Sequence, residues 1–99
     1  MHHVQTSVYR VTGDTDEVRQ RAQADLLPVF QQQEGFIEYD VTPAETWVTS
    51  TSTWQSRELA EEAGRQSAIW VRENFSALAV QLEEQSVAPA AAIGVPAVL

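Results

Sequence analysis

The chain contains neither cysteine nor lysine in its 99 residues. Without cysteine there is no disulfide framework, no thiolate nucleophile and no sulfur-ligated zinc or iron–sulfur site. Without lysine there is no Schiff-base chemistry and no lysine general base, because every basic side chain is an arginine. These two absences exclude several large classes of enzyme before any motif is considered.

Basic residues and long apolar runs are also scarce. Fourteen acidic residues against six basic ones give a formal net charge of −8 at pH 7. A protein so acidic lacks the attraction to phosphates on which nucleic-acid binding rests, so we expect no nucleic-acid or membrane partner. No run approaches the roughly 18 apolar residues of a membrane-spanning helix. No charged and apolar leader begins the chain, so we expect a cytoplasmic protein.

The length suits one small domain. We expect a single domain over residues 1–99, with a core at about 3–85 and an apolar C-terminal strand or tail at 86–99. That tail is uncharged and rich in Ala and Val. Pro89 restricts a fourth strand around Val87–Ile93 to a sheet edge or an irregular start.

The stretch Thr46–Trp54 has the β-branched and aromatic residues of a strand, without Gly or Pro. Ser56 follows it and predicts the N-cap of a helix. Because the strand is polar on both faces, it indicates a polar-lined cavity or a packed partner. Alternation predicts further strands at His3–Thr12 and Phe36–Thr42, with a short turn at Thr42–Glu45 that makes the last two strands antiparallel.

Two helices are predicted from apolar residues at helical spacing. The first begins after an Asp14 cap and ends before Gly35, with Pro28 as the site of a kink or a looser last turn. Its expected core stripe is Val18, Ala22, Leu26, Val29 and Phe30. The second runs from Ser56 to about Leu82, and Gly64 is a point at which it divides in two.

The order strand, helix, strand, strand, helix, weak strand is the split βαβ pattern of an α+β, ferredoxin-like fold. Both helices then cover one face of an antiparallel sheet. The other face is left open, which in so small a domain favours a second copy packing against it. We therefore expect a homodimer, with Trp47 and the apolar tail as candidate interface residues.

Two short motifs resemble the antibiotic-biosynthesis-monooxygenase family of dimeric α/β barrels. They are Glu34-Gly35-Phe36-Ile37-Glu38-Tyr39 and Ser52-Thr53-Trp54-Gln55-Ser56-Arg57-Glu58. In that family a Gly-Phe opens the second strand, and a Trp-x-Ser ends the third strand and caps the second helix. The resemblance spans roughly Val4–Leu82. It implies a homodimer whose two sheets face each other, with a mostly apolar pocket in each protomer between sheet and helices.

The resemblance also implies an activity. Some family members oxygenate flat aromatic polyketides with molecular oxygen and neither metal nor flavin, so we expect a cofactor-independent monooxygenase acting on an anthrone-like or quinol-like molecule. Haem-degrading relatives are similar in carrying an Asn on the first strand, a His on the second helix and a strand-end Trp; only Trp54 matches here. The alternatives are a non-catalytic dimer that binds a small apolar ligand or regulates, and a cyclase-like or isomerase-like member of the fold.

Three residues are candidate catalytic groups. Trp54 either stacks on a planar substrate or closes the strand–helix corner as a core residue. Tyr39 has a phenol suited to protonating or binding a substrate oxygen, or is an ordinary strand tyrosine, and Tyr9 has the same two readings. Asn74 is either an amide that holds a peroxide or enolate oxygen, or a solvated helix residue.

Three more residues are candidates for substrate binding. Trp70 faces the pocket, the surface or a dimer contact. Arg10 lies on the wet side of its strand or pairs with a buried acid or a substrate anion. Phe36 belongs to the pocket wall or to the core. No metal site is expected, because Glu38 and Asp40 have no further oxygen ligands near them in sequence.

Overall fold

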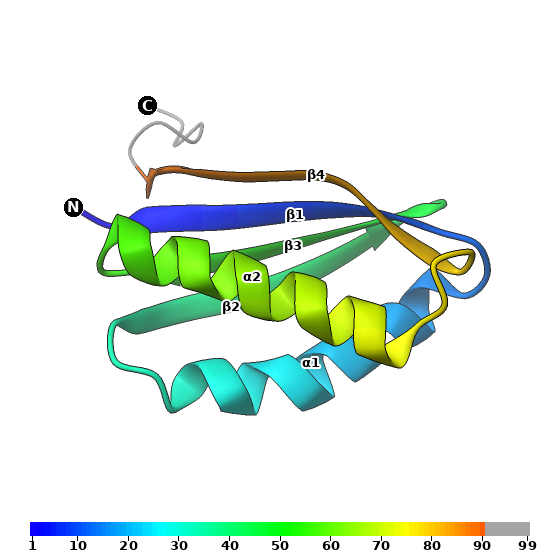
Figure 1. The fold of residues 1–99 in the computed structure, drawn as a ribbon, viewed down its shortest axis with the longest axis horizontal. Helices are drawn as coiled ribbons and strands as arrows, with labels where there is room; N and C mark the ends of the chain where they lie inside the picture. Colours follow the sequence, from blue (N-terminus) through cyan, green and yellow to red (C-terminus); the bar gives the residue numbers. More distant parts are fainter. Residues whose placement is uncertain (91–99) are drawn as a thin grey trace.

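The computed structural model describes residues 1–90, which form a four-stranded antiparallel sheet in the order β2-β3-β1-β4. Its elements are β1 (His3–Val11), α1 (Thr15–Gln31), β2 (Phe36–Ala44), β3 (Trp47–Trp54), α2 (Arg57–Asn74) and β4 (Val80–Pro89). Both helices lie on one side of the sheet (Figure 1). The predicted α+β, ferredoxin-like order is confirmed. The dimeric barrel and the domain limits stay predictions.

The two central strands, β1 and β3, have one buried face and one partly exposed face. In β3 the residues directed toward the helices are Val48, Ser50, Ser52 and Trp54, and the residues on the open face are Trp47, Thr49, Thr51 and Thr53. The hydroxyl side chains of this strand therefore differ in size between the two faces: the serines face the helices and the threonines lie on the open face. Small hydroxyl side chains let the helices approach the sheet closely on the inner face.

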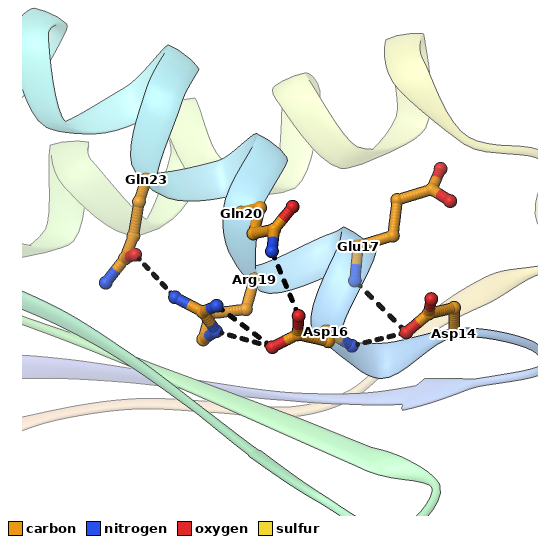
Figure 2. A network of polar contacts seen from close by, with 6 residues as sticks. All are labelled: Asp14, Asp16, Glu17, Arg19, Gln20 and Gln23. Atoms are coloured by element: carbon orange, nitrogen blue, oxygen red, sulfur yellow. Dashed lines mark hydrogen bonds and ion pairs between the residues drawn. The ribbon is translucent and has the colours of Figure 1, made fainter.

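The first helix begins where the sequence predicts. The Asp14 side chain accepts hydrogen bonds from the backbone N–H groups of Asp16 and Glu17, at 2.9 and 3.3 Å. Figure 2 shows this cap, with Asp16 also accepting from Arg19 and Gln20 in the same turn. Both acidic residues of this first turn lie at the positive end of the helix dipole, which stabilises the helix start.

The apolar stripe of α1 is narrower than predicted. Phe30 is completely buried, but Val29 is 48% exposed and is not a core residue. Val29 has the helical spacing of the predicted stripe, but its side chain lies outside the face of α1 that contacts the sheet. Pro28 lies inside the helix, which continues to Gln31.

The predicted end of the second helix at about Leu82 is wrong, because α2 ends at Asn74. Phe75 already has extended backbone angles, with φ −134° and ψ 150°. The carbonyl of Ser76 then accepts hydrogen bonds from the N–H groups of Ala79 and Val80, at 3.0 and 3.1 Å. This turn separates the helix from β4, whose alternating residues happen to continue the helical spacing.

Gly64 does not divide α2, which is continuous through it. A Cβ atom at this position would lie 3.2 Å from Gln5 Cγ and 3.3 Å from Gln85 Cδ. The glycine is therefore a point of close approach between α2 and the sheet. From the sequence alone, a glycine at a close contact between a helix and a sheet cannot be distinguished from a glycine that breaks a helix.

Two strand limits also differ from the prediction. The fourth strand is Val80–Pro89, earlier than the expected Val87–Ile93, and residues 91–93 lie outside the described part of the chain. The second strand continues through Pro43 to Ala44, so the tight turn is at Glu45, which has a φ of 54°. Among residues 1–90, no helix is long and apolar enough to cross a membrane.

An aromatic cluster fills one end of the core. The Phe30 ring centroid lies 5.1 Å from that of Tyr39 and 5.4 Å from that of Trp54, both with edge-to-face geometry. Phe36 packs on Trp54 at 5.4 Å. Such pairs stabilise the core beyond the area they bury, by about 0.5–1.5 kcal/mol each.

We predict that Phe30→Ala lowers the free energy of unfolding by about 3–5 kcal/mol, because it opens a cavity at the centre of this cluster. Urea denaturation followed by circular dichroism measures the change. The matched control is Val29→Ala on the exposed side of the same turn, which should change the free energy by less than about 0.5 kcal/mol. Equal effects of the two substitutions would contradict the burial described here.

Candidate functional site

One concave feature of the described residues is a groove between α2 and β4, which we call the α2–β4 groove. Its volume is about 460 Å³, within the range typical of small-molecule sites. Its lining residues are Tyr9, Ala68, Val71, Arg72, Phe75, Ala77, Val80, Gln81, Leu82 and Glu83. The walls are mainly apolar, and Tyr9, Arg72, Gln81 and Glu83 supply its polar groups.

One polar contact across the α2–β4 seam limits the groove. The Gln85 amide donates hydrogen bonds to the Gly64 carbonyl at 2.9 Å and to the Ser7 hydroxyl at 3.0 Å. Ser7 also accepts a hydrogen bond from Gln5 at 2.7 Å. Beyond this contact the seam opens again into a second groove of about 410 Å³, which has charged walls that include Arg57 and Glu61. The apolar groove is therefore the better site for an organic ligand.

Phe75 is held in position by contacts from both helices. Its ring lies edge-to-face with Trp70 at 5.6 Å, and the Arg21 guanidinium lies 4.4 Å from its centroid. On the opposite wall Leu82 is 42% exposed, more than is usual for a leucine in a packed core. These two side chains leave apolar surface available to a ligand.

Tyr9 belongs both to this groove and to a smaller cavity behind it. Its side chain is only 4% exposed. Burial raises the pKa of the Tyr9 phenol, an effect that the nearby Ser7 hydroxyl partly offsets. Because burial disfavours the phenolate, Tyr9 is a neutral hydrogen-bonding group near pH 7.

The smaller space, which we call the internal cavity, lies between the sheet and both helices and has a volume of about 10 Å³. Its lining residues are Tyr9, Val18, Ala22, Leu26, Tyr39, Val41, Val48, Ser50, Ser67, Trp70 and Val71, and the surface that they present to it is almost wholly apolar. Burial raises the pKa of Tyr39 well above its ordinary value, and the neighbouring Tyr9 and Asp40 add to the rise. Within residues 1–90, neither tyrosine hydroxyl has a hydrogen-bond partner of acceptable geometry.

The structure separates the candidate residues taken from the sequence. Tyr39 and Trp70 meet at the internal cavity. Trp54 and Phe36 lie in the aromatic cluster, where the Trp54 indole N–H donates to the Ser52 hydroxyl at 2.8 Å. Trp54 is completely buried, and its only N–H is already used, so in this arrangement it acts as a core residue.

The other two candidates lie away from both spaces. Asn74 is exposed at the end of α2, where its amide donates to the Trp70 carbonyl at 2.9 Å. Arg10 lies on the open face of the sheet, with its guanidinium 4.9 Å from the Trp47 ring and 3.8 Å from Glu83. Arg10 is therefore on the solvent-exposed side of β1, which is one of the two positions predicted for it from the sequence.

The groove residues Phe75 and Leu82 are not among the candidates from the sequence. Both continue the helical spacing of α2, so the sequence predicted them to be helical. The helix ends before them, at Asn74. The signal that could have found them is the alternation of Val80 and Leu82 after the hydroxyl of Ser76. Among residues 1–90, no three His, Cys, Asp or Glu side chains gather in a group able to hold a metal ion.

Solved structures share this arrangement of elements. SnoaB, a cofactor-independent oxygenase from Streptomyces nogalater, matches with a TM-score of 0.66 and 14% identity, over 90% of this chain and 92% of its own. A Chloroflexus aurantiacus protein provisionally named an antibiotic biosynthesis monooxygenase matches with a TM-score of 0.57 and 18% identity, over 89% and 91%. The chain has the fold of the antibiotic biosynthesis monooxygenases.

This fold, below called the ABM-type fold, also relates the chain to MupZ from Pseudomonas fluorescens. That match has a TM-score of 0.69 and 10% identity, over 87% of this chain and 69% of MupZ. No protein-family model matches the chain, and no curated protein is similar to it in sequence. At such identities the comparisons establish the ABM-type fold, and the chemistry has to be argued from the side chains.

The two tyrosines predict how the stability of the protein changes at alkaline pH. They are the only tyrosines in the chain, and the pKa of both phenols is raised. Below pH 10 both the folded and the unfolded states keep their phenol protons. As the pH rises past about 10 the unfolded state loses them first, so the free energy of unfolding should fall. Absorbance at 295 nm should show little phenolate until circular dichroism reports unfolding. A smooth titration centred near pH 10 in the folded protein would contradict the burial of these hydroxyls.

Proposed function

We propose that the protein is a cofactor-independent monooxygenase that binds a small planar aromatic molecule in the α2–β4 groove. The observation that carries the proposal is an apolar groove of about 460 Å³ with a buried phenol, Tyr9, among its lining residues. The volume suits a molecule of a few fused rings. The shared fold with SnoaB, whose name states a cofactor-independent oxygenase, supports the same chemistry.

A substrate of the anthrone type can react with oxygen without a resident cofactor. Its CH₂ group loses a proton to solvent at the open groove and becomes a carbanion in resonance with the enolate. The carbanion transfers one electron to O₂, and the resulting radical pair combines into a peroxide. Loss of water then leaves a carbonyl, so CH₂ and O₂ become C=O and H₂O. The protein has to provide an apolar binding surface and hydrogen-bond donors for the enolate oxygen.

Tyr9 is the proposed donor to that oxygen; its hydroxyl is fully shielded from solvent in this structure, so the substrate has to displace the side chains that cover it. Its raised pKa keeps the phenol protonated, so it can donate to an anion without losing its own proton. Phe75, already fixed by Trp70, offers a ring face or edge to the substrate. Tyr39 and Trp70 keep a proposed place in the site behind Tyr9, while Trp54 and Phe36 hold β2 and β3 together.

Oxygen consumption with a panel of anthrones and quinols tests this activity. Wild-type protein treated with chelator should consume oxygen faster than autoxidation alone. Tyr9→Phe should lower kcat about 100-fold, because it removes the donor to the enolate oxygen. Leu78→Ala, at a side chain that is 86% exposed, should leave kcat unchanged. Wild-type rates equal to autoxidation across the panel would rule out the proposed activity.

A second candidate function is ligand binding without catalysis. The observation that favours it is the solid packing around Trp54, which is fully buried and bonded to Ser52. In that case the same groove holds a small apolar ligand. Binding of panel members, measured by calorimetry, with no oxygen consumption would identify this second function.

The homodimer is proposed from the open face of the sheet. Its centre is made of small, uncharged side chains, namely Val4, Thr6, Val8, Thr49, Thr51 and Thr53. Acidic residues stand on the flanking strands, among them Asp40 on β2 and Glu84 on β4. In a chain with a net charge of −8, this uncharged centre is where two acidic copies repel each other least. Hydroxyl and methyl groups suit close packing of one sheet on another.

Light scattering at micromolar concentration should therefore give twice the 11.0 kDa mass of the chain. Thr51→Arg should give a monomer, because it places a charge at the middle of the proposed interface. Glu73→Arg, on the exposed surface of α2, introduces the same side chain and should leave the dimer intact. A monomeric wild-type protein would exclude this interface.

A further inference from the structure

We propose that the α2–β4 groove takes a planar aromatic molecule that carries a carboxylate, and that Arg72 binds this carboxylate. The inference rests on the ligand site proposed above, because it uses the same groove, and it adds the chemical class of the ligand. Arg72 is the single basic side chain among the residues that line the groove, and the other walls are mainly apolar. A cation beside apolar surface suits a molecule with one flat apolar part and one anionic group.

The first argument is that Arg72 has no acidic partner. Among residues 1–90, four of the six arginines form ion pairs with Asp or Glu, namely Arg10, Arg19, Arg57 and Arg65. Within the same part of the chain Arg72 forms none, and neither does Arg21, whose guanidinium lies over the Phe75 ring. Although the chain has fourteen acidic residues, the charge of Arg72 is therefore available to an anion from outside it.

The sequence of α2 explains why Arg72 differs from the other arginines of this helix. On a helix surface, a charged residue meets the side chains three and four positions away. Arg57 meets Glu61 in this way, at 3.2 Å. Arg65 meets Glu62, at 2.7 Å. The residues at these spacings from Arg72 carry no charge, and they are Ala68, Ile69, Phe75 and Ser76. The lack of an acidic partner is thus a property of the sequence and not of one rotamer.

The second argument concerns Glu83, the one acidic residue that lines the groove. Its carboxylate lies 3.8 Å from the Arg10 Nε atom, on the open face of the sheet. There the Arg10 guanidinium also lies over the Trp47 ring, at 4.9 Å from its centroid. Because Glu83 pairs with Arg10, it does not neutralise Arg72. The groove therefore has an unpaired positive charge, although the chain as a whole is strongly acidic.

The third argument is the chemistry of the groove walls. A guanidinium presents its N–H donors in one plane, and two of them match the two oxygens of a carboxylate. Phe75 follows Arg72 by three positions, and both side chains line the groove. Leu82 supplies exposed apolar surface on the opposite wall. A flat ring system between Phe75 and Leu82 can therefore direct a carboxylate on its edge toward Arg72.

Titration with a naphthalene carboxylate and with the carboxamide of the same ring position tests the inference. The two molecules have the same shape and differ in charge, and chemical shifts in NMR spectra measure both dissociation constants. The wild type should bind the carboxylate about five- to tenfold more tightly, a preference between that of an exposed ion pair and that of a buried charged hydrogen bond. Signals of the groove residues should shift as either compound binds.

Arg72→Gln should reduce this preference to about twofold or less, because it removes the charge that receives the carboxylate. The side chain is exposed, so the variant should fold, which circular dichroism verifies. Arg65→Gln is the matched control: it makes the same change two turns earlier on α2, in the second groove, and should keep the full preference. Arg72→Lys keeps the charge without the planar donor pair and should lie between the wild type and Arg72→Gln.

The outcomes separate this inference from the proposed activity. Equal binding of the carboxylate and the carboxamide by the wild type, or no binding of either, would overturn the inference. A preference lost in Arg65→Gln and kept in Arg72→Gln would place the carboxylate in the second groove, and would also overturn it. A preference that depends on Arg72, in a protein that consumes no oxygen with any panel member, would support the inference and rule out the monooxygenase.

Discussion

The close contact of Gly64 with Gln5 and Gln85 determines where α2 lies on the sheet. With no side chain at position 64, the helix backbone comes near enough for its carbonyl to accept a hydrogen bond from Gln85 at 2.9 Å. That same amide reaches Ser7 on the central strand, so one side chain joins α2, β4 and β1. The seam between α2 and β4 is closed at this point and open on either side of it. The groove proposed as a ligand site lies on one side of this contact.

Buried hydroxyl groups are the second constraint on the interior. The inner face of the sheet carries Ser7, Ser50 and Ser52 where most small domains have aliphatic side chains. Each of these groups has to find a partner, and Ser52 finds one in the Trp54 indole. The aromatic cluster and the polar centre are thus parts of the same core.

The sequence was sufficient for the order of elements and for both helix N-caps. Caps and alternation are local signals, so Asp14, Ser56 and the Thr46–Trp54 run could be interpreted one at a time. The C-terminal third was harder to predict. Phe75 and Leu82 continue the helical spacing of α2, while the residues next to Leu82 alternate as in a strand. What decides between them is the turn at Ser76, a backbone feature with a weak sequence signature.

The candidate site was predicted less well, for a physical reason. A groove forms where no side chain fills the space between two elements. Gly64 has its role only because Gln5 and Gln85 lie against it in the folded chain. Spacing along the chain does not report that contact. The aromatic residues selected from the sequence include Trp54 and Tyr39, of which the first lies in the core and the second behind the groove.

The position of β1 in the sheet has a consequence for how the chain is made. Among the described strands β1 is the first to leave the ribosome, and it pairs with β3 and with β4, the last of them to be synthesised. Its His3 lies opposite Pro89, so this sheet is incomplete until residue 89 has been synthesised. Contacts of such long sequence separation fold slowly. Until β4 is synthesised, the nascent protein therefore exposes the edge of β1 that β4 later covers, and during that interval a chaperone or a second nascent copy has access to it.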